Sequence, residues 1–196
     1  MDELILASAS PRRRELLAAT GRAFRVVPSD AEESVPPGMP PGKAAEHLAC
    51  LKAAAVAARL TRGTVIAADT IVTSGSDIIG KPSDRADAIR ILEKLSRRPH
   101  TVITGVCLMD AGTGRRLSAS DRTVVHMRPM ERAEIEAYVD SGEAMGKAGA
   151  YAIQETGDRF VERVEGSFSN VVGLPMELLE RMLREFDGSA DRSFQR

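Results

Sequence analysis

The segment LILASASPRRRELL, residues 4–17, places three consecutive arginines in the first turn of a predicted helix. Pro11 fits the first helical position, and Ser10 fits the capping position before it. Cations are unfavourable at a helix N-terminus because the free N–H groups there already carry a partial positive charge. A bound anion would reverse this cost, so the segment indicates an anion-binding site.

Helical geometry separates the three arginines. Leu16 and Leu17 mark the buried stripe of the helix, and Arg13 lies three and four residues before them, over the centre of that stripe. Arg12 lies at the edge of the stripe, and Arg14 lies well off it. We therefore expect Arg14 to be solvated and Arg13 to point inward.

An inward arginine is costly without a partner. We favour an anion site built from Arg13, the free helix N–H groups and the hydroxyl of Ser8 or Ser10. A carboxylate elsewhere in the chain is the alternative partner for Arg13.

Asp69 follows the apolar run VIAA near the end of a predicted buried strand. A buried acid is expensive unless it is paired, hydrogen-bonded or bound to a metal. Because ligand sites of α/β folds gather at the carboxyl ends of strands, we favour a functional role for Asp69. A buried ion pair with an arginine is the alternative.

Lys81 lies at the end of a glycine-containing stretch that resembles a phosphate-binding loop. Gly75, Gly80 and Lys81 have the spacing of the phosphate loop GxxxxGK[ST], but the next residue is Pro82. Proline lacks the hydroxyl that binds Mg²⁺, and it disfavours a helical backbone at Lys81, so this motif is rejected. The residues leave open whether Lys81 reaches a phosphate from a turn or is simply an exposed turn lysine.

Three more charged residues have ordinary explanations when taken singly. Glu32 and Glu33 lie in a predicted loop, where solvated carboxylates are the rule, and Lys52 lies at the edge of a helical apolar stripe, where its stem covers apolar surface. Together with Asp69 and the helix start, however, they supply cations and carboxylates able to hold Mg²⁺, without a Ser-His or Cys-His nucleophile. This inventory suits metal-assisted attack of water on a phosphoanhydride.

The composition limits the class of fold and the kinds of binding partner that the protein can have. With 43% hydrophobic residues and alternating strand-like and helix-like segments, the 196 residues predict one α/β domain over 1–186 and a frayed tail at 187–196. Lys and Arg (27) nearly balance Asp and Glu (28), so we expect no nucleic-acid partner and no membrane partner. The N-terminus carries no leader signal and no apolar run approaches the ~20 residues that span a bilayer, which favours the cytoplasm. Cys50 and Cys107 are expected to be buried, reduced thiols.

Periodicity and turn signals divide the chain into elements that must position these residues. We expect strands at 3–8, 23–29, 63–74, 150–154 and 168–175, and two long strands within 100–127 joined at 111–114. We expect helices at 11–20, 43–60, 83–96 with Ser83 as the cap, 128–142 and 176–186, a loop at 32–42, and a hairpin-like turn at 74–84.

The chain resembles the Maf family of nucleotide pyrophosphatases from end to end. The matching segments are LASASPRRREL, AEES, HLACLKA, AADTIV, GKP, TGV, SGEAMGKAGAYAIQ and GSFSNVVGLP, in the family order and spacing. The resemblance implies hydrolysis of a nucleoside triphosphate between its α and β phosphates with a divalent cation, Mg²⁺ or Mn²⁺. It also implies a mixed twisted sheet flanked by helices, in two lobes with a central cleft, and a homodimer.

The resemblance also implies roles for individual residues. The general base falls on Asp69, and the phosphate and metal site falls on Ser8, Arg13, Glu33, Lys52 and Lys81, with Glu33 and Asp69 as the metal ligands. Three specificity positions read Arg12, Thr70 and Gln154, a set similar to the branch that acts on dTTP and UTP. Glu32 stands where the family usually has Asp, with its charge kept. The alternative is a nucleotide-binding regulator of septum formation that does not turn its ligand over.

Overall fold

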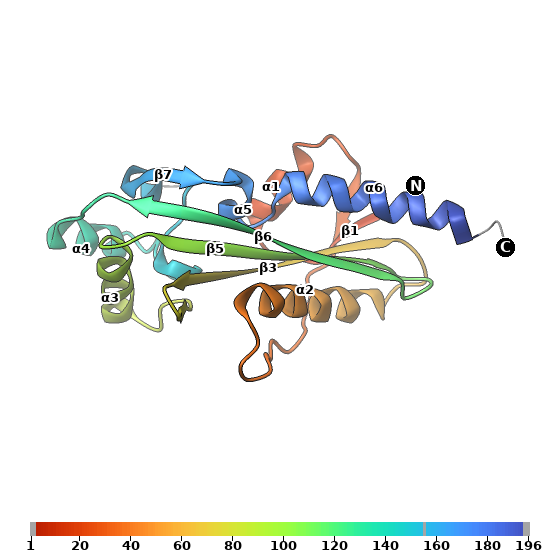
Figure 1. The fold of residues 1–196 in the computed structure, drawn as a ribbon, viewed down its shortest axis with the longest axis horizontal. Helices are drawn as coiled ribbons and strands as arrows, with labels where there is room; N and C mark the ends of the chain where they lie inside the picture. The colour runs from red at the N-terminus through yellow and green to blue at the C-terminus, as the bar shows by residue number, and fades with distance from the viewer. Residues whose placement is uncertain (1–2, 155, 194–196) are drawn as a thin grey trace.

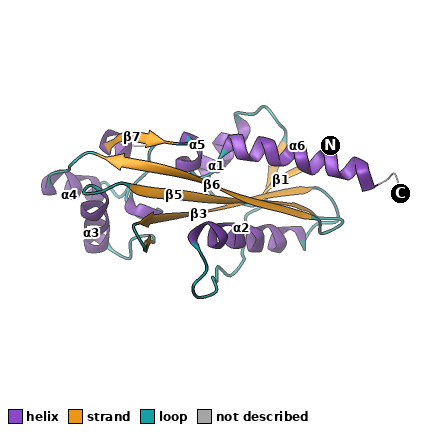
Figure 2. Cartoon of the chain, viewed as in Figure 1, coloured by secondary structure: helices purple, strands orange, loops and turns teal. Residues whose placement is uncertain are grey.

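Seven strands form one mixed sheet in the computed structural model, which describes residues 3–154 and 156–193 (Figure 1, Figure 2). The strands run in the order β2-β1-β3-β5-β6-β7, with β4 paired to β3. β1 pairs in parallel with β2 and β3, and every other pair is antiparallel. The bounds are β1 Leu4–Leu6, β2 Phe24–Val26, β3 Thr64–Ser74, β4 Asp77–Ile79, β5 His100–Asp110, β6 Arg116–Met127 and β7 Val161–Glu165.

The two edges of β3 are used differently. Along one edge, β5 pairs with β3 from Thr64 to Thr73. Along the other edge, β1 pairs with Thr64–Ile66 and β4 pairs with Val72–Ser74. Among the described residues, no strand pairs with this second edge between Ala68 and Ile71. The gap lies in the middle of the sheet, beside Asp69.

Six α-helices flank the sheet in the described part of the chain: α1 Pro11–Ala18, α2 Pro41–Ala57, α3 Arg85–Leu95, α4 Arg132–Asp140, α5 Phe168–Val172 and α6 Met176–Ser193. The same part of the chain also contains two short 3₁₀ helices, at Ala148–Ala150 and Thr156–Phe160. Figure 1 shows α2 along one face of the sheet and α6 along the other, with α3 and α4 at the far end. Because side chains alternate along a strand, the odd-numbered Val65 and Ala67 of β3 pack in one apolar cluster with Ala49 and Ala53 of α2. The even-numbered residues of β3 therefore face α1, α5 and α6.

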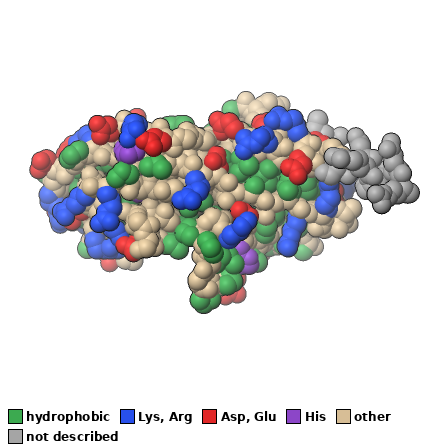
Figure 3. Space-filling view, viewed as in Figure 1, with side chains coloured by type: hydrophobic (Ala, Val, Ile, Leu, Met, Phe, Trp, Pro, Cys, Tyr) green, Lys and Arg blue, Asp and Glu red, His purple; other side chains and the backbone are tan. Residues whose placement is uncertain are grey.

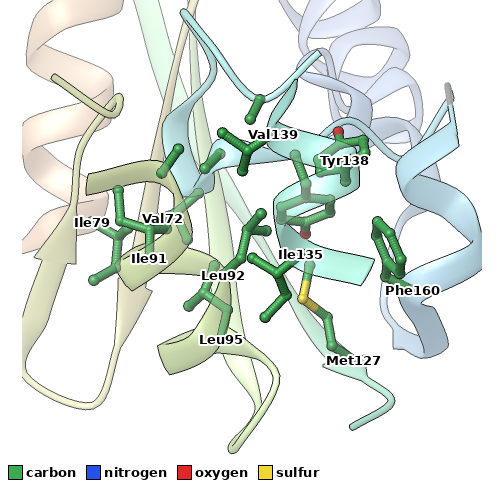
Figure 4. Close-up of a cluster of buried hydrophobic side chains, with 14 of the residues drawn as sticks. Val72, Ile79, Ile91, Leu92, Leu95, Met127, Ile135, Tyr138, Val139 and Phe160 are labelled. Carbon is green, nitrogen blue, oxygen red and sulfur yellow. The ribbon is translucent and has the colours of Figure 1, made fainter. Parts of the chain in front are cut away.

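The apolar core is divided between the two ends of the sheet. One cluster gathers α3, α4 and the ends of the long strands around Val72, Leu92, Tyr138 and Phe160 (Figure 4). The others lie around α2 and α6. This division confirms the expected fold, a mixed α/β sheet in two lobes.

The hairpin expected at 111–114 is confirmed, and so is the loop expected at 32–42 as far as Pro40, because α2 begins at Pro41. Two of the expected strands are wrong. Where a strand was expected at 168–175, residues Phe168–Val172 form helix α5, because Ser167 caps it by accepting a hydrogen bond from Asn170 N (3.3 Å), and Gly173 ends it at φ 122°. Residues 150–154 form no strand, because Gly149 and Ala150 turn the chain at φ 80° and 58°. Strand β7, which completes the sheet, was not predicted.

Two helix ends also differ from expectation. Asp84, not Ser83, caps α3, since its side chain accepts a hydrogen bond from Asp87 N at 2.8 Å. Helix α6 continues past residue 186 to Ser193. The remaining residues of the expected tail, 194–196, lie outside the described residues.

The surface carries both signs of charge. On the face shown in Figure 3, Lys and Arg side chains are interspersed with Asp and Glu. None of the described helices has the combination of length and apolar character that crossing a membrane requires.

Candidate active site

A cavity of about 200 Å³ lies at the uncovered edge of β3, between the two lobes. Its lining combines polar side chains, most of them cationic, with apolar side chains. Its lining residues are Ser10, Arg12, Arg13, Lys52, Asp69, Thr70, Val72, Lys81, Val102, Gly146, Lys147, Ala148, Tyr151, Ile153, Val171, Val172 and Gly173.

The sheet topology explains why α1 begins at this cavity. β1 runs parallel to β3 with Leu6 opposite Ile66, so the chain leaves β1 beside the gap in β3. Ser8 and Ser10 follow, and Ser10 caps α1 by accepting a hydrogen bond from Arg13 N at 3.5 Å. The helix N-terminus predicted to bind an anion therefore opens onto the cavity.

Asp69 and Thr70 are neighbours in sequence but reach opposite faces of the sheet. Asp69 faces α2, where Lys52 Nζ lies 2.5 Å from Asp69 Oδ1. Thr70 faces α1, where its Oγ1 accepts a hydrogen bond from Arg13 Nη2 at 3.1 Å. The strand thus brings one carboxylate and one hydroxyl to the same cavity from its two sides.

Lys52 joins two carboxylates. Its ammonium also lies 2.9 Å from Glu33 Oε1, so the loop at 32–42, α2 and β3 converge on one cation. The side chains of Lys52 and Asp69 are only 14% and 11% exposed, which makes their contact a buried ion pair rather than a surface one. Asp69 therefore does have the buried ion pair weighed above, but with a lysine of α2 and not with an arginine.

The cations around Glu33 set its protonation. Partial burial on its own raises the pKa of this carboxyl group, but the hydrogen bond from Lys52 and the charges of Lys52, Lys81 and Arg13 outweigh it. The pKa of Glu33 is therefore below its ordinary value, and Glu33 is ionised at neutral pH.

Arg13 is held by groups without charge. Its Nε donates to Gly173 O at 2.8 Å, its Nη1 to Ser8 Oγ at 3.4 Å and its Nη2 to Thr70 Oγ1. Burial of the guanidinium lowers the pKa of Arg13 from its ordinary value, the charge of Asp69 opposes this shift, and the neighbouring charge of Arg12 adds to it. An arginine whose charge is not matched by a contacting carboxylate is well suited to bind an anion.

The structure places the other predicted residues unevenly. Arg12 and Lys81 line the cavity, and Arg14 is exposed, as helical geometry predicted. Ser8 is buried and touches Arg13. Gln154 is exposed and is not among the lining residues, although its neighbour Ile153 is.

Residues 146–151 form a wall of the cavity that sequence reasoning missed. Lys147 and Tyr151 line the cavity, and Tyr151 Oη lies 2.8 Å from Nε2 of the buried His100. Burial lowers the pKa of His100 to about 4, so the imidazole is neutral at pH 7. The available signal was the repeated glycine of GKAGAY, because Gly146 and Gly149 have φ values of 73° and 80°, which favour glycine.

The carboxylates fit a metal that arrives with a ligand. The described residues contain no group of three or more His, Cys, Asp or Glu side chains placed to hold a metal ion. Glu33 and Asp69 nevertheless each give only one oxygen to Lys52 Nζ, which leaves the second oxygen of each carboxylate for a cation, and Asp69 lines the cavity. Mg²⁺ is commonly bound by one or two carboxylates together with substrate phosphates, and the two carboxylates meet this need.

The cavity can bind a molecule with an anionic end and an apolar end. Its positive charge comes from Arg12, Arg13, Lys52, Lys81 and Lys147, and its apolar surface comes from Val72, Val102, Tyr151, Ile153 and Val172. Asp69 lines the same cavity as these cations and is paired with Lys52.

Comparison with known proteins agrees with this chemistry. The model of the family described as Maf-like protein matches residues 3–186. The chain is 45% identical over 186 residues to the dTTP/UTP pyrophosphatase of Pelotomaculum thermopropionicum, covering 95% of this chain and 97% of that protein. It is 48% identical over 186 residues to the dTTP/UTP pyrophosphatase of Moorella thermoacetica, covering 95% and 96%, and 47% identical over 178 residues to that of Syntrophomonas wolfei, covering 91% and 94%.

Proposed function

The chain belongs to the family of Maf-like proteins, and on that premise we propose that it hydrolyses dTTP and UTP to the nucleoside monophosphate and pyrophosphate. The observation that carries the proposal is the carboxylate of Asp69 at the edge of a cavity whose other polar side chains are mostly cationic. Relatives that match more than nine tenths of the chain carry the name dTTP/UTP pyrophosphatase, which supports the choice of substrate.

In this proposal the triphosphate binds along the cationic side chains of the cavity. Arg13, Lys81 and the N-terminus of α1 contact phosphate oxygens, and Ser8 holds Arg13 in place. Water attacks the α-phosphorus, the bond to the bridging oxygen breaks, and pyrophosphate leaves. Asp69 takes the proton of the attacking water, and the cations neutralise the charge that develops on the phosphates.

Lys52 keeps Asp69 in position for this step. Its contact occupies Oδ1 of Asp69 and leaves the other carboxylate oxygen for the water. The same ammonium holds Glu33, so the loop and the strand keep their relative positions.

A divalent cation, Mg²⁺ or Mn²⁺, completes the proposed site. Glu33 and Asp69 would hold it through the carboxylate oxygens that do not contact Lys52. When bound, it supplies positive charge that polarises the phosphoanhydride.

We assign recognition of the substrate's nucleobase to Arg12, Thr70 and Gln154, in keeping with the family resemblance. Gln154 is exposed just outside the cavity, where its amide could reach the imide edge of thymine or uracil as both donor and acceptor. Thr70 acts through the guanidinium of Arg13, with which it is hydrogen-bonded.

The remaining expectations concern context. We propose that the protein acts on free nucleotides in the cytoplasm, as a homodimer, with neither nucleic acid nor membrane as a partner. Sedimentation analysis of the purified protein, with and without nucleotide, tests the dimer.

The experiment that tests the activity is pyrophosphate release with Mg²⁺ or Mn²⁺ from dTTP, UTP, CTP, dATP, GTP and 7-methyl-GTP, with Asp69→Asn in parallel. We expect rapid cleavage of dTTP and UTP, abolished in Asp69→Asn and by EDTA. Tight binding of dTTP without turnover under any metal would contradict the proposal and favour a regulator that signals by being occupied. Unchanged turnover in Asp69→Asn would exclude Asp69 as the base.

A further inference from the structure

A chain of hydrogen bonds runs from Arg13 into the core of the protein. Arg13 Nη2 donates to Thr70 Oγ1 at 3.1 Å, and Thr70 Oγ1 lies 3.0 Å from Thr104 Oγ1. Thr104 Oγ1 donates in turn to the backbone carbonyl of Asn170 at 3.1 Å. Thr104 is fully buried and does not line the cavity, so it cannot touch a bound nucleotide.

The direction of this chain follows from counting protons. The Asn170 carbonyl can only accept, so the single hydroxyl proton of Thr104 is committed to it. Thr70 must therefore donate its own proton to Thr104, and its oxygen is left to accept from Arg13. Each of the two hydroxyls therefore accepts one hydrogen bond and donates one, in a fixed direction.

Asn170 also helps to fix the Gly173 carbonyl, which is another hydrogen-bond acceptor of Arg13. Its side-chain Nδ2 donates to Val102 O on β5 at 3.0 Å and to Thr123 Oγ1 on β6 at 2.9 Å, which pins α5 to the sheet. Helix α5 ends at Gly173, whose carbonyl accepts from Arg13 Nε at 2.8 Å. Two of the three contacts of the guanidinium thus depend on Thr104 and Asn170.

We propose that Thr104 and Asn170 are positioning residues that set the orientation of Arg13 through the Thr70 hydroxyl and the Gly173 carbonyl. The proposal rests on the proposed function, in which Arg13 contacts the phosphates. It assigns a task to two segments, TGV and SNVVGLP, that the mechanism otherwise leaves without one. A correctly aimed guanidinium requires both of its anchors at once, because a small displacement of a catalytic group is costly in rate.

The test compares two substitutions that differ by a hydroxyl. Thr104→Val keeps the shape of the side chain but removes the acceptor for Thr70 and the donor to Asn170, whereas Thr104→Ser keeps both. We expect Thr104→Val to lower kcat/KM for dTTP by about 10- to 100-fold, from the usual cost of leaving buried polar groups unpaired. We expect Thr104→Ser to remain within about 3-fold of wild type. Thr101→Val, on the same strand but outside the chain of hydrogen bonds, is the matched control and should leave kcat/KM unchanged.

A second measurement separates positioning from stability. Each substitution is repeated in an Arg13→Lys background, and binding of inorganic pyrophosphate is measured by calorimetry alongside the unfolding midpoint. If Thr104 acts through Arg13, Thr104→Val weakens pyrophosphate binding in the parent, and its effects on binding and on rate shrink to less than about 3-fold in Arg13→Lys. Equal effects in both backgrounds, or a lower unfolding midpoint with unchanged kcat/KM and unchanged binding, would overturn the proposal.

The outcomes also distinguish this inference from the proposed function. If wild type releases no pyrophosphate from any nucleotide, the proposed activity fails, while the comparison of pyrophosphate binding still decides on Thr104. If wild type is active and Thr104→Val matches Thr104→Ser in rate and binding, the activity stands and the inference fails. If wild type neither turns over nucleotides nor binds pyrophosphate, both fail.

Discussion

Asp69 and Gly105 lie directly opposite each other on β3 and β5, and Gly105 is also a point where α2 packs against the sheet. A Cβ atom added at Gly105 would lie 2.2 Å from the backbone carbon of Ala45 and 2.4 Å from Glu46 N, so only glycine fits. The close approach of α2 brings Lys52 within 2.5 Å of Asp69. The glycine on one strand thus makes room for the ion pair of its neighbour.

Gly105→Ala is expected to damage both stability and activity. The added methyl group meets helix backbone, which cannot move without shifting α2, so the free energy of unfolding should fall by about 1–3 kcal/mol or more. The activity should fall further than the folded fraction, because Lys52 moves with α2. Urea denaturation and pyrophosphate release under conditions where the variant is folded measure the two effects.

Gly188→Ala is the control for this substitution. Gly188 lies in α6, and among the described residues no atom other than those of its chain neighbours and its own helix backbone lies within 4 Å of the place that an added Cβ would take. Alanine should therefore leave activity unchanged and stabilise the helix by about 0.5–1 kcal/mol. A Gly105→Ala protein as stable as wild type would show that α2 adapts freely.

Lys52→Met is expected to reduce kcat/KM by at least about 100-fold and to destabilise the protein by about 3 kcal/mol. The substitution leaves the buried carboxylate of Asp69 without its cation, which is the costly way to break a buried pair. In an Asp69→Asn background the stability cost of Lys52→Met should shrink, because no unpaired charge is left behind. Thermal and urea unfolding of the four proteins check this.

Lys43→Met provides the matched comparison on the same helix. Lys43 is exposed and pairs with Glu46 three residues later, a surface contact worth about 0–1 kcal/mol. Its removal should leave kcat/KM within about 2-fold of wild type, since a surface ion pair contributes little. Equal losses for the two lysines would argue against a special role for Lys52.

Arg13→Ala should damage kcat/KM far more than Arg14→Ala. Arg13 lines the cavity and is fixed by three hydrogen bonds, whereas Arg14 is exposed. We expect a loss of about 100-fold or more for Arg13, in line with removal of a charged hydrogen bond to the transition state, and almost none for Arg14. Steady-state kinetics with dTTP test this pair, and similar losses would refute the assignment by helical face.

Local geometry explains what the sequence could predict of the site. The inward direction of Arg13 and the solvation of Arg14 follow from helix periodicity, and the cost of burying Asp69 follows from its strand. Lys52, by contrast, looked like an ordinary snorkelling lysine. Its pairing with Asp69 depends on how closely α2 packs on β3, a contact across 17 residues that no local pattern encodes.

The misread segments have a related cause. The short apolar run at 150–153 is buried, with Tyr151 and Ile153 packed in the lobe that contains α3 and α4, and it does not form a strand. In α5, the cap from Ser167 outweighs the strand preference of its valines. The roles of Thr104 and Asn170 depend on partners up to 68 residues away, so their chemistry appears only once the sheet is assembled.

Protonation of His100 should make the free energy of unfolding depend on pH. Burial lowers the pKa of His100 to about 4 in the folded protein, against 6.5 for the ordinary side chain. Below pH 6.5 the unfolded chain therefore takes up a proton that the folded chain refuses, and the free energy of unfolding falls as the pH decreases towards 4. At about 1.4 kcal/mol per pKa unit, the full loss is about 3 kcal/mol, and no further loss from this group follows below pH 4. Urea unfolding of wild type and His100→Gln between pH 4 and 7.5 measures this loss, and the two stability curves should converge as the pH falls. Parallel curves for wild type and His100→Gln would mean that His100 accepts its proton in the folded protein. Water would then have access to the imidazole beside Tyr151.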